Sequence, residues 1–165
     1  MVLHKVLGAS SRSNLDLILL SNTLCVYLAQ SYLVFYDFRA ATPVLTSPNP
    51  NPSKPYRSLA FDSQRSLLFA GEGACKQGEI HVFRINNITQ QTTAAAVVTI
   101  ELETVLRGHR YGVSAIALLK DVVMSIGDEN DKGLILWEMC TPRMLGANMI
   151  TKAKIRGVVA LPLND

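Results

Sequence analysis

Residues 106–138 read LRGHRYGVSAIALLKDVVMSIGDENDKGLILWE, and the order of turn signals and apolar runs in this stretch decides the fold. The runs predict three strands, at residues 113–119, 122–126 and 134–138. The expected turns are Gly108-His109, Lys120-Asp121 and residues 127–133. Because such short turns join antiparallel strands, the stretch predicts a small antiparallel sheet, with a further short strand at residues 144–149.

Two earlier groups of apolar runs repeat this pattern in weaker form. The first group consists of residues 15–20, 24–28 and 32–38. The second group consists of residues 56–61, 65–71 and 79–85, and a strand at residues 97–106 follows it. The first group is almost continuously hydrophobic, so we expect its strands to be buried on both faces, as they are where sheets stack on one another.

Two segments between these runs lack a clear strand pattern. Residues 42–55, TPVLTSPNPNPSKP, contain five of the seven prolines, and each proline removes an N–H donor and restricts the residue before it. This composition excludes a helix or a central strand and predicts a stiff, exposed connection. Residues 86–96, NNITQQTTAAA, have no periodic pattern and predict a solvated, mobile loop insertion.

The composition is that of a folded intracellular protein. The 165 residues are 48% hydrophobic, which is enough for a packed core, and the net charge of +3 is too evenly spread to indicate nucleic-acid binding. Cys25, Cys75 and Cys140 lie far apart, so we expect reduced thiols in a cytoplasmic protein. No apolar leader or membrane-spanning run is present, so secretion and membrane insertion are not expected, and the glycosylation sequon at residues 87–89 is attributed to chance.

The order of signals in residues 106–138 resembles a WD-repeat, the unit of a β-propeller blade. The resemblance rests on Gly108-His109, Ser125, Asp131, Gly133 and Trp137-Glu138, with Glu138 in place of the usual aspartate. Phe38, Phe83 and Trp137 are expected at the same place in successive groups. More narrowly, GHRYGVSAIAL and AGEGACKQGEIHVF are similar to the first repeats of the mitogen-activated protein kinase-binding protein group of WD-repeat proteins, and less closely to flagellar and microtubule-associated ones.

This resemblance implies an all-β fold of antiparallel WD-repeat β-propeller blades. The blades are expected at about residues 3–46, 56–105 and 106–149, with a partial fourth blade at residues 150–165. Closed propellers have about 4 to 8 blades. We therefore expect an incomplete propeller, which is a piece of a longer one or completes its ring with another chain.

The resemblance also implies a buried hydrogen-bonded tetrad. Trp137 would donate to Ser125, Ser125 would bond His109, and His109 would bond Asp131. The expected role is to brace one blade and not to form a catalytic triad, because buried polar groups are normally satisfied in this way. The second group has Ala70 in the hydroxyl position and Phe83 in the indole position, so its blade is expected to rely on packing alone.

Other candidate chemistry is sparse. The glycines between Gly71 and Gly78 lack the ending of a phosphate-binding loop, and the histidines show no metal-ligand spacing, so no catalytic residue, cofactor or metal is predicted. Thr42, Ser47 and Thr141 each precede a proline. They are either proline-directed phosphorylation sites or ordinary turn residues, and the sequence leaves both possibilities open.

The tetrad also predicts where a partner would bind. The turns that carry His109 and Asp131 must lie at one end of the blade, and the exposed residues expected there are Arg110, Tyr111, Asp128, Glu129 and Lys76. Such a mixture is typical of a protein-binding surface, although simple solvated loop tips would look the same.

The function predicted from these features is a non-enzymatic protein-protein interaction scaffold. The resemblance implies a cytoplasmic setting linked to kinase signalling or the cytoskeleton. The alternative is a permanent structural subunit of a microtubule or ciliary assembly. The expected partners are other proteins, and neither nucleic acid nor a membrane.

Overall fold

A computed structural model of the chain describes residues 17–73, 76–89, 96–139 and 141–149. These residues form twelve strands in three four-stranded antiparallel sheets, so the all-β prediction is confirmed. Within the described ranges, no helix is long and apolar enough to cross a membrane. The predicted partial blade at residues 150–165, together with Cys75 and Cys140, lies outside the described residues.

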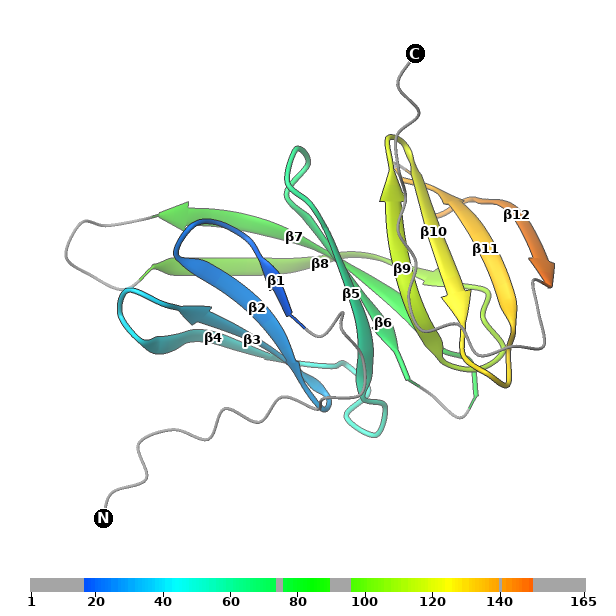
Figure 1. Cartoon of the computed structure of the whole chain (residues 1–165), viewed down its shortest axis with the longest axis horizontal. Coiled ribbons are helices and arrows are strands. Elements are labelled where there is room, and N and C mark those ends of the chain that lie inside the picture. Colours follow the sequence, from blue (N-terminus) through cyan, green and yellow to red (C-terminus); the bar gives the residue numbers. More distant parts are fainter. Residues whose placement is uncertain (1–16, 74–75, 90–95, 140, 150–165) are drawn as a thin grey trace.

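Each sheet is built from strands that follow one another along the chain (Figure 1). The first sheet contains β1 (Leu17–Leu19), β2 (Leu24–Ala29), β3 (Tyr32–Asp37) and β4 (Thr42–Pro48). The second contains β5 (Tyr56–Asp62), β6 (Leu67–Glu72), β7 (Glu79–Thr89) and β8 (Val97–Arg107). The third contains β9 (Val113–Leu119), β10 (Val122–Gly127), β11 (Gly133–Glu138) and β12 (Met144–Met149).

The second sheet lies between the other two, and both of its faces are covered (Figure 1). One apolar cluster joins β2 and β3 to the second sheet through side chains such as Phe35 and Leu59. A second cluster joins the second sheet to the third through side chains such as Phe69 and Trp137. Every residue of Leu24–Leu28 is buried, as the hydrophobic run predicted. Burial of these stacked faces is the main favourable contribution to folding.

The proline-rich segment begins as a strand, so the prediction of a connection over residues 42–55 is wrong for its first half. β4 pairs with β3 from Asp37↔Thr42 to Tyr32↔Pro48. It is the outermost strand of its sheet, and an edge strand tolerates proline because one side of its backbone needs no partner. The connection to the second sheet is limited to residues 49–55.

The prediction of a loop at residues 86–96 is also wrong where the structure describes it. β7 continues to Thr89 and pairs with β8 through Asn86↔Thr99 and Thr89↔Val97. Ala96 is buried, and its N–H donates to Asp37 Oδ2 over 2.8 Å. Together with the N–H groups of residues 39 and 40, this bond lowers the pKa of the Asp37 carboxyl. Residues 90–95 lie outside the described ranges.

Phe38 does not occupy the place expected for it. It follows the last residue of β3 and is 49% exposed, whereas Phe83 and Trp137 are buried. The fully buried aromatic side chain of β3 is Phe35. Phe38 instead packs its ring edge-to-face on Tyr36, with the centroids 5.7 Å apart.

This assignment predicts unequal effects of two phenylalanine substitutions. Phe35→Ala should lower the free energy of unfolding by about 3 to 5 kcal/mol, because it leaves a cavity between two sheets. Phe38→Ala should lower it by at most about 1.5 kcal/mol, the contribution of an aromatic pair. Urea unfolding followed by circular dichroism measures both values, and equal effects would contradict the assignment.

Candidate functional site

The four tetrad residues lie together, two in strands of the third sheet and two in the loops at one end of it. The Trp137 indole N–H donates to Ser125 Oγ over 2.8 Å, and Ser125 Oγ lies 2.8 Å from His109 Nε2. On the other side of the ring, His109 Nδ1 lies 3.3 Å from Asp131 Oδ2. The side chains of Ser125, His109 and Trp137 are buried. The chain of contacts therefore runs from the core of the sheet to a surface turn.

The donor and acceptor of each hydrogen bond in the tetrad follow from the groups at its two ends, Trp137 and Asp131. An indole N–H can only donate, and an ionised carboxylate can only accept. Ser125 therefore accepts from Trp137 and donates to His109 Nε2, while His109 Nδ1–H donates to Asp131. Burial lowers the pKa of His109 despite the nearby Asp131 carboxylate, so the neutral ring that this pattern requires is the favoured form.

The acidic turn after β10 also holds the segment that precedes β9. Asp131 Oδ2 accepts the Tyr111 N–H over 2.9 Å, and Asp128 Oδ2 accepts the Gly112 N–H over 3.2 Å. The other oxygen of Asp128 accepts the N–H groups of Asn130 and Asp131. Asp128 is one of the predicted partner residues. It is half-buried, and both of its carboxylate oxygens stabilise the conformation of these loops.

Two backbone hydrogen bonds join the loops of the second and third sheets. The N–H groups of Gln77 and Gly78 donate to the carbonyls of Arg110 and Tyr111, each over 2.8 Å. A Cβ atom on Gly78 would lie 2.2 Å from the Tyr111 carbonyl oxygen, so only glycine permits this approach. The loops of two sheets therefore form one continuous surface.

This surface, the tetrad face, carries the predicted partner residues. It consists of residues 76–78, 108–112 and 128–132, and Lys76, Arg110 and Glu129 are exposed on it. The Arg110 guanidinium carbon lies 5.9 Å from the centre of the half-buried Tyr111 ring. Beside them is a hollow of about 410 Å³, lined by Gln77, Gly78, Glu79, Arg107, Gly108 and His109.

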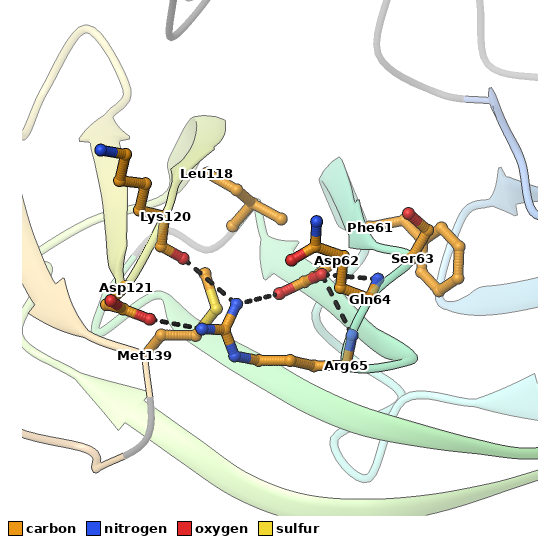
Figure 2. Close-up of a pocket in the computed structure, with 9 residues that line it drawn as sticks. All are labelled: Phe61, Asp62, Ser63, Gln64, Arg65, Leu118, Lys120, Asp121 and Met139. Atoms are coloured by element: carbon orange, nitrogen blue, oxygen red, sulfur yellow. Dashed lines mark hydrogen bonds and ion pairs between the residues drawn. The ribbon is translucent and has the colours of Figure 1, made fainter. Parts of the chain in front are cut away.

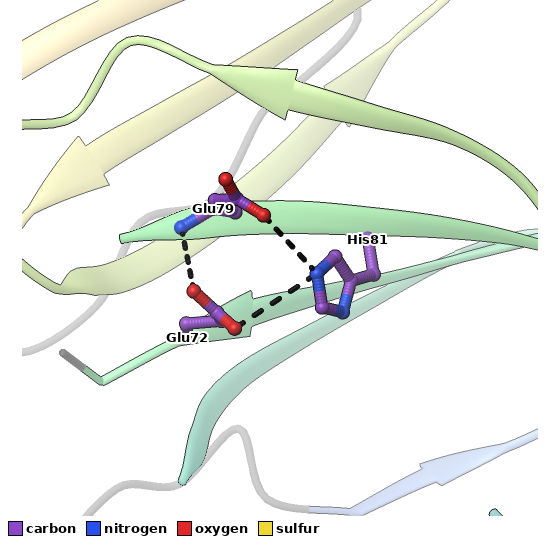
Figure 3. Close-up of side chains that lie close together, drawn as sticks. All are labelled: Glu72, Glu79 and His81. Carbon is purple, nitrogen blue, oxygen red and sulfur yellow. Dashed lines mark hydrogen bonds and ion pairs between the residues drawn. The ribbon is translucent and has the colours of Figure 1, made fainter. Parts of the chain in front are cut away.

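The second sheet has a buried polar cluster of its own, so the prediction that it relies on packing alone is wrong. Figure 3 shows Glu72, Glu79 and His81, which lie at the ends of β6 and β7 nearest the tetrad face. His81 Nδ1 lies 2.8 Å from the Tyr56 hydroxyl. Its Nε2 faces Glu79 Oε2 at 3.6 Å and Glu72 Oε1 at 3.8 Å.

Residues from three segments hold the two carboxylates of this cluster. Glu72 is fully buried and accepts hydrogen bonds from the Asn49 amide, the Lys54 ammonium and the backbone N–H of Glu79. Glu79 Oε1 accepts a bond of 2.8 Å from Arg107. The sequence analysis did not predict this cluster. The pattern that could have indicated it is a glutamate and a histidine within otherwise apolar strands.

The opposite end of the same two sheets carries a different contact, which Figure 2 shows. Arg65, in the turn after β5, bonds Asp62 Oδ2 at 2.9 Å and the Lys120 carbonyl at 3.3 Å, and it also pairs with Asp121. A hollow of about 500 Å³ opens there. Arg65 therefore joins the turn after β5 in the second sheet to the turn after β9 in the third sheet. No local sequence pattern predicts this contact.

Comparisons with known proteins identify the fold. No protein-family model and no curated protein matches the sequence. The computationally designed Ika8 protein is similar in structure, with a TM-score of 0.63 and 15% identity, over 90% of this chain and 39% of its own. The WD40 β-propeller domain of Doa1 is similar with a TM-score of 0.57 and 15% identity, over 86% of this chain and 43% of its own.

At this identity the likeness concerns the fold alone. The chain has a WD40-like β-propeller fold, as the WD-repeat resemblance implied, and its three sheets correspond to propeller blades. The chain spans less than half the length of either similar structure. An incomplete propeller is consistent with these findings.

Removing the central hydroxyl of the tetrad tests its role as a brace. Ser125→Ala should lower the free energy of unfolding by about 1 to 3 kcal/mol, because it leaves the buried groups of Trp137 and His109 without a partner. Ser114→Ala is the matched control, because that half-buried hydroxyl bonds only backbone carbonyls. Its effect should be about 1 kcal/mol or less, as for a typical single hydrogen bond. Denaturant unfolding measures both variants, and a larger loss for Ser114→Ala would contradict the brace.

The two buried histidines predict how stability depends on pH. Burial lowers the pKa of His81 and of His109 below the ordinary value of 6.5, although nearby carboxylates oppose the shift in each case. The unfolded chain therefore binds protons first, and the stability of the folded state should fall as the pH drops below 6.5. The Glu79 carboxyl, whose pKa is lowered from 4.5, should contribute a further loss only below that value. Thermal melting between pH 8 and about 4 measures this, and a flat profile from pH 7 to 5 would contradict it.

Proposed function

We propose that this chain is a non-enzymatic protein-protein interaction scaffold that binds its partner through the tetrad face. The observation that carries the proposal is the pair of backbone bonds from Gln77 and Gly78 to the segment 110–111. These bonds make one surface from two sheets and fix the backbone that carries its exposed side chains. A surface whose backbone is already ordered loses little conformational entropy when a partner binds.

The side chains of this surface support the same proposal. Arg110 and Tyr111 are of the two residue types, arginine and tyrosine, that contribute most often to binding energy at protein interfaces. Lys76 and Glu129 are exposed beside them and supply charges of both signs. A protein partner with a polar rim around a central aromatic contact fits this composition.

The non-enzymatic part of the proposal is supported by the state of the tetrad. Ser125 is completely buried, and its oxygen is engaged by both Trp137 and His109. A nucleophile needs an approach path for its substrate, and this hydroxyl lies inside the sheet. The contacts of the serine, histidine and aspartate of the tetrad therefore support a structural role for these residues within the sheet.

The finer setting is proposed on the WD-repeat resemblance. It is a cytoplasmic scaffold linked to kinase signalling or the cytoskeleton, with further blades or another chain closing the ring. The second candidate is a permanent subunit of a microtubule or ciliary assembly. Cosedimentation with purified microtubules distinguishes the two, since only the second requires stable binding to the polymer.

Substitution of both Arg110 and Tyr111 by alanine tests the binding surface. Partners retained by the wild-type protein on an affinity resin, identified by mass spectrometry, should be retained at least about ten-fold less by the double variant, which corresponds to 1.4 kcal/mol. The loss is expected because both side chains contribute to the proposed contact.

The matched control for this experiment is Ser63→Ala with Gln64→Ala. These two exposed residues lie in the turn after β5, at the opposite end of the sheets. The control should retain the same partners as the wild type, and circular dichroism should show that both variants are folded. Equal retention by all three proteins would overturn the proposal.

A further inference from the structure

The Glu72, Glu79 and His81 cluster contains three metal-ligand atoms that converge on one point (Figure 3). One ligand atom from each side chain lies within 4.8 Å of the other two. The His81 ring is 97% buried, since its exposed fraction is 3%, and its Nε2 points at both carboxylates. The two oxygens that face Nε2 stand 3.6 and 3.8 Å away, which is beyond the length of a hydrogen bond.

The contact between His81 and Tyr56 is compatible with two positions of the ring proton. If Nε2 carried the proton, it could form a charge-assisted hydrogen bond of about 2.8 Å with either oxygen. If Nδ1 carries the proton and donates it to the Tyr56 hydroxyl, a lone pair on Nε2 faces two negative oxygens. A cation between the three atoms resolves that repulsion. In tetrahedral coordination with bonds of about 2.0 to 2.1 Å, ligand atoms are about 3.3 to 3.4 Å apart, a few tenths of an ångström closer than the nitrogen–oxygen distances of 3.6 and 3.8 Å seen here.

The surroundings of the three side chains are those of a supported metal site. Glu72 Oε2 accepts hydrogen bonds from Lys54 and from the backbone N–H of Glu79, while Oε1 faces His81 and also accepts the Asn49 amide N–H over 3.1 Å. Glu79 Oε1 is held by Arg107, which leaves Oε2 directed toward His81. His81 Nδ1 is held by Tyr56. Outer contacts of this kind orient metal ligands in known sites.

A path to the cluster is also present. Glu79 lines the hollow of about 410 Å³ on the tetrad face, and its side chain is 25% exposed. An ion can therefore enter from solvent beside Glu79, and a water molecule can complete its coordination there.

From this geometry we propose that Glu72, Glu79 and His81 form a binding site for one divalent transition-metal ion of the zinc type. One imidazole and two carboxylates match the preference of Zn²⁺ for nitrogen and oxygen ligands in a four-coordinate site with one open position. The Lys54 ammonium beside Glu72 opposes the ion electrostatically and sets a moderate affinity. A bound ion would join β6 to β7 directly beneath the loops of the tetrad face.

Calorimetric titration with Zn²⁺ after treatment with a chelator tests the site. The wild-type chain should bind one equivalent, and Co²⁺ in its place should give the visible absorption of a nitrogen- and oxygen-ligated tetrahedral ion. Glu79→Gln should weaken binding at least ten-fold, as should His81→Gln, because each removes a ligand.

Two matched controls separate this site from other metal-binding groups. Glu103→Gln changes an exposed carboxylate of β8 that pairs with Arg84, and Glu101→Gln changes a second exposed carboxylate of the same strand. Both should bind Zn²⁺ as the wild type does. Glu79 is partly exposed, so its variant should fold even if His81→Gln does not, and thermal melting with and without Zn²⁺ checks each protein. Absence of Zn²⁺ binding would overturn the proposal. Binding that Glu79→Gln and a folded His81→Gln leave unchanged would also overturn it, because it would indicate an adventitious ion only.

Discussion

A four-stranded sheet with two apolar faces cannot remain alone in water, and this constraint determines the arrangement of the molecule. The second sheet satisfies it by lying between the first and the third, with Phe35 and Leu59 on one side and Phe69 and Trp137 on the other. Stacking also fixes which loops meet. The segment 110–111 can bond Gln77 and Gly78 only because β9 packs beside the second sheet. The tetrad face is therefore a consequence of core packing.

Buried polar groups refine this packing differently in the two sheets that form the tetrad face. In the third sheet the hydrogen bonds run through Ser125 and His109 to Asp131, whereas in the second sheet Lys54 pairs with Glu72 and Arg107 pairs with Glu79. Both networks are close to the same set of loops. A loop anchored from below by hydrogen bonds costs less entropy to hold in one conformation, so both clusters support the surface above them.

The fold and the tetrad could be predicted from the sequence because their signals are local or match a known order. Turn residues and apolar runs marked most strands, and the four tetrad residues lie within one stretch of the chain. The failures have physical causes. An edge strand tolerates the prolines of β4, and the long pairing of β7 with β8 overrides the weak propensity of residues 86–89. The Glu72 cluster draws on residues between Asn49 and Arg107, whose contacts only the folded chain reveals.

The sequential order of strands within each sheet has a kinetic consequence. Among the described residues, every ladder joins strands that are neighbours along the chain, so each sheet can form from contacts of short sequence separation. Only stacking of one sheet on another requires distant segments to meet. As the chain leaves the ribosome, the first sheet can be complete before the second exists, and its apolar inner face then has no cover. We therefore expect the sheets of this protein to fold one after another. The protein should be most prone to aggregation in the interval between the formation of one sheet and the next.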